Sequence, residues 1–205
     1  MKIAAGFLAG GLARRMGGGD KANLQLAGKS LLAWQLEATI DIECRILNAN
    51  GSADRFKAYG LPVIADRLEG FLGPLAGIHA MLTYLKEAHP DMTHLLSLAT
   101  DAPFIPSYLA SHMQSALSDS DADIAIASSG GRHHPVFALW PLDLQQDLER
   151  SVRDHGMRKI DDFTARYKTV FVPFERADNA ASPNPFLNIN RPEDLEAAEI
   201  WLRNQ

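Results

Sequence analysis

The chain has 205 residues, with 20 Lys and Arg against 25 Asp and Glu and a formal net charge of −5. This length suits one large domain better than two small ones, and a hydrophobic content of 46% is ordinary for a globular protein. The negative net charge argues against a general nucleic-acid binder. A single cysteine, Cys44, excludes an internal disulfide and a cysteine metal cage.

The sequence predicts neither export nor membrane insertion. The first residues enter an apolar segment without a signal-like region, and no apolar run is long enough to span a bilayer. We therefore expect a cytoplasmic protein that has neither nucleic acid nor a membrane as a partner.

Short apolar runs alternate with helical patterns along the chain. The predicted strands are 3–8, 44–48, 62–65, 94–99, 123–127, 136–140 and 169–172, and the predicted helices are 29–39, 74–88, 106–117 and 192–202. This alternation indicates an α/β protein, a three-layer α/β/α sandwich around a mostly parallel sheet. The gap between 123–127 and 136–140 is too short for a helical crossover, so one of these strands should be antiparallel and the sheet mixed.

The first strand runs into a glycine-rich segment that ends at Lys21 and also carries Arg14 and Arg15. Glycines let backbone N–H groups approach anionic oxygens closely, and the cations neutralise charge that the backbone cannot. A strand followed by such a loop and a helix is how α/β proteins hold nucleotide phosphates. The segment therefore predicts an anion site, with a flexible surface loop as the alternative.

Two better-known phosphate motifs do not fit this chain. The run from Ala27 to Ser30 resembles the end of a P-loop, but Asn23 stands where the first glycine is required. The run from Gly17 to Ala22 matches the dinucleotide fingerprint as a string, but it follows Arg-Arg-Met rather than a strand. A different kind of phosphate site is therefore expected.

Acidic residues directly follow two later strands. Asp66 comes after 62–65, and Asp101 comes after 94–99. The carboxyl ends of parallel strands meet at one edge, so both carboxylates should face the crevice that the glycine segment borders. Because Mg²⁺ prefers one or two carboxylates together with phosphate oxygens and water, we favour Asp101 as a metal ligand over a turn cap. For Asp66, a site role and a turn role are equally open.

Several amide and imidazole side chains lie near the same predicted edge. Asn48 ends the second strand and Asn50 follows it, where their amides could read a ribose or a base, although Asn-Gly is also a common turn. Asn190 precedes the last helix and is expected to be its N-cap, whereas Asn188 has no such role, with a turn as its structural alternative. His134 and the histidine before it should face opposite sides of a strand, which makes them a poor pair of metal ligands.

The segment from Leu8 to Lys21 resembles the signature of nucleotidyltransferases with the glycosyltransferase-A-like α/β fold. Its Ala-Arg-Arg-Met-Gly-Gly variant resembles that of the molybdenum cofactor guanylyltransferases. Further matching blocks follow in family order at 48–50, 64–66, 73–77, 100–104, 134–135 and 188–195. Because these blocks span nearly the whole chain, the resemblance implies a single nucleotidyltransferase domain over residues 1–205. It also implies the Rossmann-type fold of the nucleotide-diphospho-sugar transferases.

The resemblance implies roles for individual residues. Lys21 corresponds to the phosphate lysine, Arg15 to a residue that wraps the triphosphate, and Asp101 to a ligand of the nucleotide and Mg²⁺; these three are the implied catalytic residues. The implied nucleotide-binding set is Leu8, Ala9, Gly10, Gly11, Gly18, Lys21, Asn50, Asp66 and Asp101. The residues that match the molybdopterin side are Arg158, Asn188 and Asn190. Segment 128–134 is variable in the family, so no contact is carried over there.

The implied reaction transfers GMP from GTP to the phosphate of molybdopterin or Mo-molybdopterin, with Mg²⁺ as cofactor and release of pyrophosphate. Because two anions must meet and the acceptor is already charged, charge neutralisation and positioning matter more than a general base. The implied protein partners are those of molybdenum cofactor biosynthesis and molybdoenzyme maturation.

Three other functions remain open at this point. The chain could use CTP, could be a sugar-1-phosphate nucleotidyltransferase, or could be a non-catalytic carrier of nucleotide or molybdopterin. Arg15, Lys21 and Asp101 together argue against a carrier, because a carrier does not need a metal carboxylate and a leaving-group clamp at once.

Overall fold

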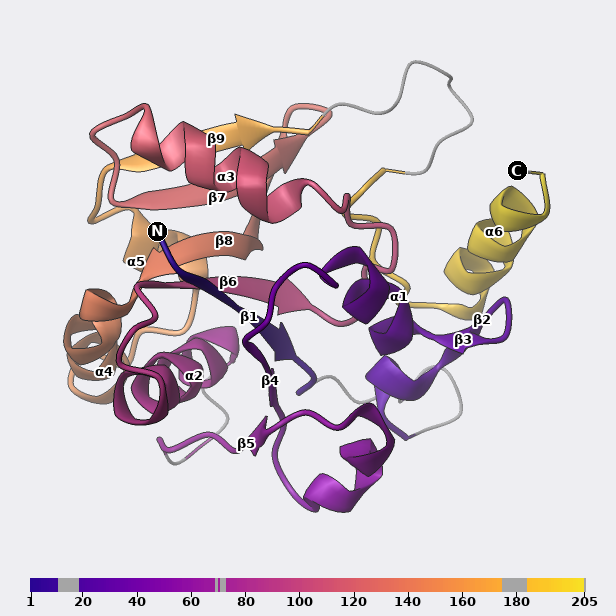
Figure 1. Cartoon of the computed structure of the whole chain (residues 1–205), viewed down its shortest axis with the longest axis horizontal. Helices are drawn as coiled ribbons and strands as arrows, with labels where there is room; N and C mark the ends of the chain where they lie inside the picture. Colours follow the sequence, from indigo (N-terminus) through magenta and orange to yellow (C-terminus); the bar gives the residue numbers. More distant parts are fainter. Residues whose placement is uncertain (11–18, 69, 71–72, 175–183, 205) are drawn as a thin grey trace.

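The main β-sheet is mixed and covered by helices, as the sequence predicts. The computed structural model describes residues 1–10, 19–68, 70, 73–174 and 184–204. Within these residues the main sheet has seven strands in the order β5-β4-β1-β6-β8-β7-β9 (Figure 1). The strands are, in chain order, β1 (Ile3–Leu8), β4 (Arg45–Asn48), β5 (Val63–Ile64), β6 (His94–Ala99), β7 (Ile124–Ser129), β8 (Arg132–Pro141) and β9 (Thr169–Pro173).

The direction of the strands sets where their ends meet. Strands β5, β4, β1 and β6 are mutually parallel, whereas β8 is antiparallel to both of its neighbours and β7 pairs in parallel with β9. The antiparallel β8 confirms the mixed sheet expected from the short gap before it. In the centre, Leu8 lies in register with Asn48 on one side and Ala99 on the other. The last residues of β1, β4 and β6 therefore form one continuous edge.

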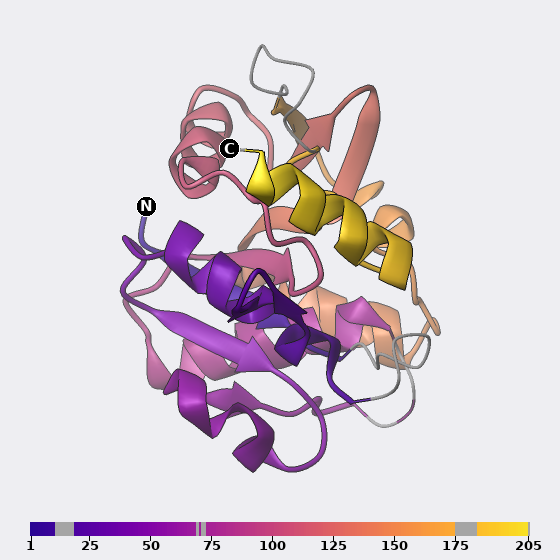
Figure 2. The same cartoon turned by 90° about the vertical axis from the view of Figure 1, so that its right-hand side faces the viewer.

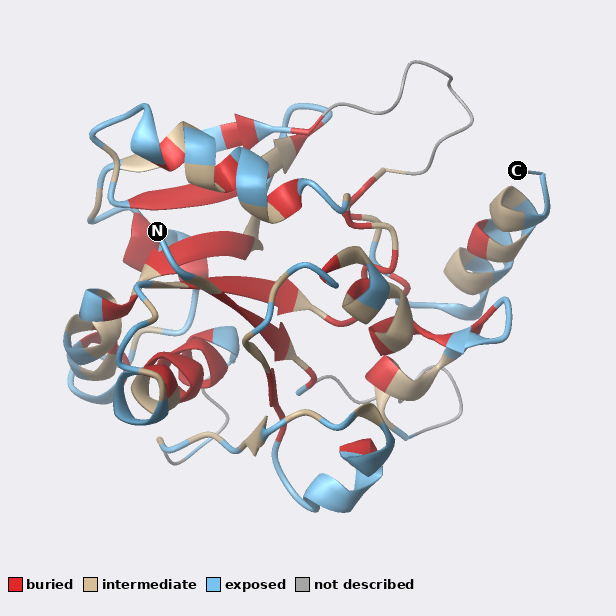
Figure 3. Ribbon diagram, viewed as in Figure 1, coloured by how far each residue is buried: buried red, intermediate tan, exposed pale blue. Residues whose placement is uncertain are grey.

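Helices cover both faces of the sheet and give the predicted three layers (Figure 1). One face carries α2 (Pro74–Ala88), α4 (Gln145–Arg153) and α5 (Ile160–Thr164), and the other carries α1 (Leu31–Ala38) and α3 (Leu109–Ser118). Most of the central strands are buried between these helices (Figure 3). Each interface is apolar, and Phe7 and Trp140 are fully buried on opposite faces. Full burial of a side chain such as Phe7 contributes about 1.5–3 kcal/mol, so these two interfaces hold the strand ends in place.

The last helix, α6 (Pro192–Arg203), lies outside this sandwich (Figure 2). It packs on the short hairpin of β2 (Gln25–Leu26) and β3 (Lys29–Ser30), where Ala198 joins a small apolar cluster with Leu26 and Leu31. This packing brings the chain before α6 back to the segment that follows the glycine-rich region.

The start of α1 differs from the prediction. Residues 27 and 28 have φ values of 51° and 81°, the left-handed conformations that a two-residue hairpin turn requires. The hairpin continues to Ser30, whose Oγ accepts a hydrogen bond from the N–H of Ala33 at 3.1 Å and caps α1. The helix therefore begins at Leu31 and not at residue 29, and the run from Ala27 to Ser30 is a hairpin turn rather than a phosphate loop.

Several helices lack a clear sequence signal. The buried residues of α4 are Leu148, Ser151 and Val152, so its apolar stripe is narrow, and α5 is only five residues long. The 3-10 helix Ala53–Tyr59 buries Phe56 alone, and α3 begins three residues after its predicted start. No helix among the described residues has the length and apolar character needed to cross a membrane.

Candidate active site

Backbone hydrogen bonds join three strand ends into one platform. The carbonyl of Leu8 accepts from the N–H of Thr100 at 3.4 Å and from its Oγ1 at 3.1 Å. On the other side, the N–H of Ala9 donates to the carbonyl of Asn48 at 2.9 Å. Ala9 is buried and Gly10 is exposed.

The platform carries a cluster of Lys21, Asp101 and Asn190. The ammonium of Lys21 donates to Asp101 Oδ2 at 2.7 Å and also to Asn190 Oδ1. The side chains of Lys21 and Asp101 are only 12% and 19% exposed, so this ion pair is shielded from water. The fold therefore brings together residues that are predicted for the phosphate, the metal and the acceptor side, and that lie far apart in the sequence.

The second oxygen of Asp101 is suited to a cation. Asp101 Oδ1 is buried and has no hydrogen-bond partner among the described residues. A buried carboxylate oxygen without a partner costs free energy, and it is the hard ligand that Mg²⁺ prefers. No group of three or more His, Cys, Asp or Glu side chains in the described part of the chain could hold a metal by itself. A cation at Asp101 would therefore need oxygens from water or from the substrate phosphates.

Gln35 supports the turn that carries Asp101. This side chain of α1 is fully buried, and its Nε2 donates to the carbonyls of Ala99 at 2.5 Å and Ala102 at 2.7 Å. On the opposite side, the N–H of Ile189 donates to the carbonyl of Asp101 at 2.7 Å. Sequence reasoning placed Gln35 only within a helical pattern. The sequence signal that could have revealed its role is that Gln35, a polar residue, occupies a position of that pattern where an apolar residue is expected.

A second cluster, of Asn48, Asn50 and Asp66, lies beyond the other side of β1. Asp66 Oδ1 accepts from the Asn48 amide at 2.9 Å, and Asp66 Oδ2 accepts from the Asn50 amide at 2.8 Å. The N–H of Asp66 returns a hydrogen bond of 2.9 Å to Asn50 Oδ1. Unlike Asp101, Asp66 already accepts a hydrogen bond at each carboxylate oxygen. This arrangement favours a polar surface with fixed amide groups over a second metal ligand.

Helix α2 approaches these strand ends closely because of a glycine. A Cβ at Gly77 would lie 2.3 Å from Asn48 Oδ1 and 2.6 Å from Leu8 Cδ2. Gly73, just before the helix, has a φ of 69° that non-glycine residues rarely adopt. The small residues of 73–77 therefore permit tight packing of α2 against the strand ends.

Arg55 connects the two clusters and was missed by sequence reasoning. Its guanidinium forms an ion pair with Asp20, donates to the carbonyl of Asn50, and donates to the carbonyl of Ser52 at 3.0 Å. Asp20 directly precedes Lys21. No local motif marks Arg55, because its ion-pair partner Asp20 is distant in sequence.

Asn190 is not the N-cap of the last helix, contrary to the prediction. The cap is Arg191. The carboxylate of Asp194 accepts from the backbone N–H groups of Asn190 at 2.8 Å and Arg191 at 2.9 Å. Because Asp194 already satisfies these first N–H groups, the Asn190 side chain is available to Lys21.

The remaining predicted residues are less closely connected to the cluster. Asn188 is exposed. Arg158 is exposed, and its guanidinium donates to the carbonyls of Val152 and Met157. The backbone carbonyl of Arg158 lies close to Gly73, at 3.4 Å from the position that a Cβ on Gly73 would take. Arg158 therefore lies beside the start of α2, and no described hydrogen bond joins it to Lys21 or Asp101. Three predicted residues fall outside the described residues: Gly11, Arg15 and Gly18.

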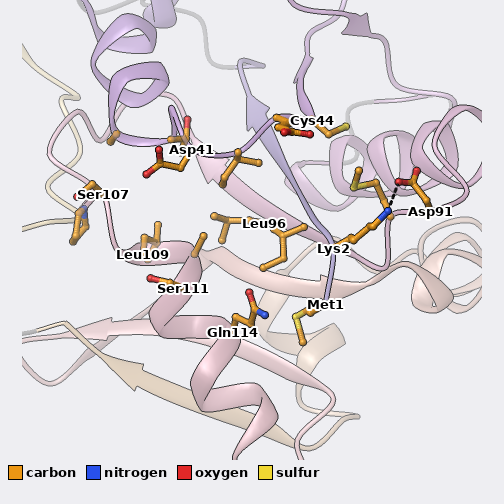
Figure 4. Close-up of a pocket in the computed structure, with 18 residues that line it drawn as sticks. Met1, Lys2, Asp41, Cys44, Asp91, Leu96, Ser107, Leu109, Ser111 and Gln114 are labelled. Carbon is orange, nitrogen blue, oxygen red and sulfur yellow. Dashed lines mark hydrogen bonds and ion pairs between the residues drawn. The ribbon is translucent and has the colours of Figure 1, made fainter.

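A cavity of about 420 Å³ opens at the opposite edge of the sheet (Figure 4). It is lined by residues at the amino ends of β1, β4 and β6 and at the start of α3, including Lys2, Cys44, Met92 and Leu109. None of the predicted site residues lines it, so the candidate active site is the carboxyl edge and not this cavity.

Comparisons with known proteins identify the family of the chain. The model of the MobA-like NTP transferase domain matches residues 5–170. The chain is 48% identical over 201 residues to a molybdenum cofactor guanylyltransferase of Rhodopseudomonas palustris (strain BisB5), an alignment that covers 96% of this chain and 93% of that protein.

Solved structures show the same architecture. The crystal structure of molybdopterin-guanine dinucleotide biosynthesis protein A from Archaeoglobus fulgidus superposes with a TM-score of 0.76 at 26% identity, covering 98% of this chain and all of that one. The 2-C-methyl-D-erythritol 4-phosphate cytidylyltransferase of Thermus thermophilus shares the fold, with a TM-score of 0.66 at 20% identity over 99% and 100% of the two chains. Together with the domain match over residues 5–170, these similarities show that the chain belongs to the MobA-like NTP transferase family that includes the molybdenum cofactor guanylyltransferases.

Proposed function

We infer that the chain transfers GMP from GTP to the phosphate of molybdopterin, which releases pyrophosphate and forms the molybdopterin guanine dinucleotide cofactor. The observation that carries this inference is the ion pair of Lys21 and Asp101 at the carboxyl edge of the sheet, 2.7 Å between its charged atoms. It occurs in a chain that is 48% identical to a molybdenum cofactor guanylyltransferase over 96% of its length.

The reaction demands charge neutralisation above all. An oxygen of the acceptor phosphate attacks the α-phosphorus of GTP, and the bond from that phosphorus to the bridging oxygen of the leaving pyrophosphate breaks. Lys21, oriented by Asn190, would attract the phosphate oxygens of the leaving group. The acceptor oxygen already carries negative charge, so no side chain has to remove a proton from it.

Asp101 is proposed as the protein ligand of Mg²⁺. Its buried Oδ1, which has no hydrogen-bond partner in the described part of the chain, supports this assignment, since a cation would compensate that oxygen. When bound, Mg²⁺ would supply neutralisation of the phosphate oxygens as charge shifts during transfer.

The further contacts implied by the family resemblance remain proposals for this chain. The proposed nucleotide side comprises Leu8, Ala9, Gly10, Gly11, Arg15, Gly18, Asn50 and Asp66, and the proposed acceptor side comprises Arg158, Asn188 and Asn190. The amides held around Asp66 support the first set, because fixed donors and acceptors suit a ribose or a base. We also propose that residues 1–205 act as a single domain, which the contact between Lys21 and Asn190 supports.

The test is a nucleotide screen with purified molybdopterin as the acceptor. The chain is supplied with Mg²⁺ and GTP, CTP, ATP or UTP, and both pyrophosphate release and the mass of the dinucleotide product are measured. We expect GTP to be preferred by about 100-fold or more, since hydrogen bonds to the base edge discriminate strongly. A preference for CTP, or transfer to a sugar 1-phosphate in place of molybdopterin, would contradict the proposal. Nucleotide binding without pyrophosphate release would indicate a carrier.

A further inference from the structure

Ser129, His134 and Asn184 form a hydrogen-bonded cluster where β7 ends and β8 begins. His134 Nε2 lies 2.8 Å from Ser129 Oγ, and Ser129 Oγ lies 2.9 Å from Asn184 Oδ1. Ser129 is buried. The neighbouring His133 instead stacks on Phe171, so the two histidines do face apart as predicted. The proposed nucleotide and acceptor sides include no residue of this cluster.

The direction of each hydrogen bond follows from the backbone. Asn184 Oδ1 accepts from the N–H of Phe186 at 2.9 Å, which identifies that atom as the amide oxygen. The hydroxyl of Ser129 then donates to Asn184, and the oxygen of Ser129 accepts from His134. His134 therefore carries a proton on Nε2.

The protonation state of His134 does not disturb this pattern. Burial and the nearby Arg132 lower the pKa of His134. The ring is therefore neutral at physiological pH and has its single proton on Nε2. Because the imidazolium form also carries a proton there, the bond to Ser129 is kept on either side of the pKa.

The cluster fixes one end of a segment whose other end lies in the active site. Segment 184–190 begins at Asn184, and its Phe186 is buried with its ring centroid 4.6 Å from that of His134. At the far end, Ile189 donates to the carbonyl of Asp101, and Asn190 accepts from Lys21. Segment 184–190 is thus held at one end by the cluster and at the other end by the active site.

We propose that His134 is a positioning residue for the transfer step. It acts through Ser129 and Asn184 on segment 184–190, and so holds Asn190 against Lys21. This role rests on the proposed function. Its effect should fall more on transfer than on GTP binding, because segment 184–190 contacts Lys21 but no described hydrogen bond joins it to Asn50 or Asp66.

Two amide variants separate positioning from packing and from proton transfer. The amide nitrogen of His134→Gln can occupy the place of Nε2, whereas that of His134→Asn reaches only the place of Nδ1. We expect His134→Gln to retain kcat within about threefold, and His134→Asn and His134→Leu to lose about tenfold or more, as for one buried hydrogen bond. The KM for GTP should stay within about threefold in all three variants.

A second pair of variants tests the partner atom. Asn184→Asp keeps an acceptor oxygen and should retain kcat, whereas Asn184→Leu removes it and should behave like His134→Leu. Only variants that unfold within about 3 °C of wild type are compared, a shift that corresponds to about 1 kcal/mol or less. This criterion separates a loss of positioning from a loss of folded protein.

A measurement independent of activity reads the cluster directly. The ¹⁵N shifts of the His134 ring, assigned by their absence in His134→Gln, should show a proton on Nε2 at neutral pH. A proton on Nδ1 alone, or equal kcat values in all variants, would overturn the positioning role. The positioning role would also be overturned if kcat fell as far in His134→Gln as in His134→Leu and one limb of the pH profile of kcat disappeared. That result would indicate proton transfer by His134. Absence of GMP transfer by the wild-type protein would instead contradict the proposed function, and the role of His134 with it.

Discussion

The ion pair of Lys21 and Asp101 is better explained by a role in ligand binding and catalysis than by a contribution to folding stability. Taking both charges out of water costs about as much free energy as their attraction returns, so such pairs often contribute little to folding. Here the pair is more than four-fifths buried, and one carboxylate oxygen has no partner among the described residues. A site of this kind suits a ligand that supplies charge.

The first prediction concerns the charge of Asp101. Asp101→Asn keeps the shape of the side chain but removes its charge, so we expect kcat to fall by about 100-fold or more. The dissociation constant of GTP should change by less than about tenfold, because Lys21 and the backbone still hold the phosphates. Pyrophosphate release and calorimetric titration measure the two effects. The matched control is Asp119→Asn at the exposed end of α3, and equal rates in both variants would remove Asp101 from the site.

The second prediction concerns Gly77. The Cβ of Gly77→Ala would overlap Asn48 Oδ1, so Asn48 must move away from Asp66. We expect the KM for GTP to rise by about tenfold, which corresponds to the loss of about one hydrogen bond to a charged group. Steady-state kinetics with GTP as the varied substrate measure the change.

A double-mutant cycle shows whether Gly77 acts through Asn48. In the background of Asn48→Ala the obstructing oxygen is gone, so Gly77→Ala should have a much smaller effect on the KM for GTP. If the two effects simply add, the contact with Leu8 and not Asn48 is responsible.

At the scale of elements, α1 supports the active-site turn through one side chain. Gln35 donates to two carbonyls that flank Asp101. Gln35→Met keeps the length of the side chain but leaves both carbonyls without their donor. We expect the free energy of unfolding to fall by about 1–3 kcal/mol, together with a lower kcat as the turn loosens. Urea unfolding and pyrophosphate release measure the two effects.

The control for this third prediction lies on the same helix. Leu36→Met exchanges apolar groups of similar volume and should cost less than about 1.5 kcal/mol. If Gln35→Met lowered the free energy of unfolding no more than Leu36→Met does, Gln35 would contribute packing alone.

Which elements could be predicted depended on how local their signals are. β1, β6 and α2 were predicted to the residue, because continuous apolar runs define the strands and Pro74 marks the helix start. α1 was predicted two residues too long at its start, because the hairpin turn at 27–28 leaves no mark in the helical periodicity. α4 was missed because its apolar stripe is too narrow.

In the active site, too, residues could be predicted only where their signals are local in the sequence. Lys21 and Asp101 could be placed at one sheet edge from their positions after strands, and the structure confirms that they meet. Gln35 could not be assigned a role, since it acts on backbone carbonyls of a segment distant in sequence. Arg55 could not be assigned one either, since its ion-pair partner Asp20 is distant in sequence. Asn190 was misassigned because an asparagine before a helix usually caps it, and the competing Asp194 lies inside the helix.

For the whole molecule, a buried histidine between α2 and α4 should make stability depend on pH. Burial lowers the pKa of His79, and the carboxylate of Glu149 only partly opposes this effect. The unfolded chain takes up a proton below the ordinary pKa of about 6.5, whereas the folded protein resists it. Stability should therefore fall as the pH drops below that value and on through the lowered pKa of the folded state.

The fourth prediction tests this dependence with His79→Gln. This variant cannot take up the proton, so its free energy of unfolding should decrease less between pH 7.5 and 5.0. The difference from wild type is limited to about 1.4 kcal/mol for each pH unit. Urea unfolding at several pH values measures it, and His155→Gln, at an exposed position, is the control. Parallel pH curves for wild type and His79→Gln would contradict this account.

The pairing of Lys21 with Asp101 also makes the site selective for ligands that carry both positive and negative charge. An anion that bound Lys21 by itself would leave the Asp101 carboxylate without its counter-charge. A cation that bound Asp101 by itself would leave the Lys21 ammonium without its counter-charge. A ligand that carries both signs can separate the pair and compensate each half. A nucleotide that arrives with its counter-ion is such a ligand, whereas free phosphate is not, so the site should discriminate against the abundant small anions that surround it.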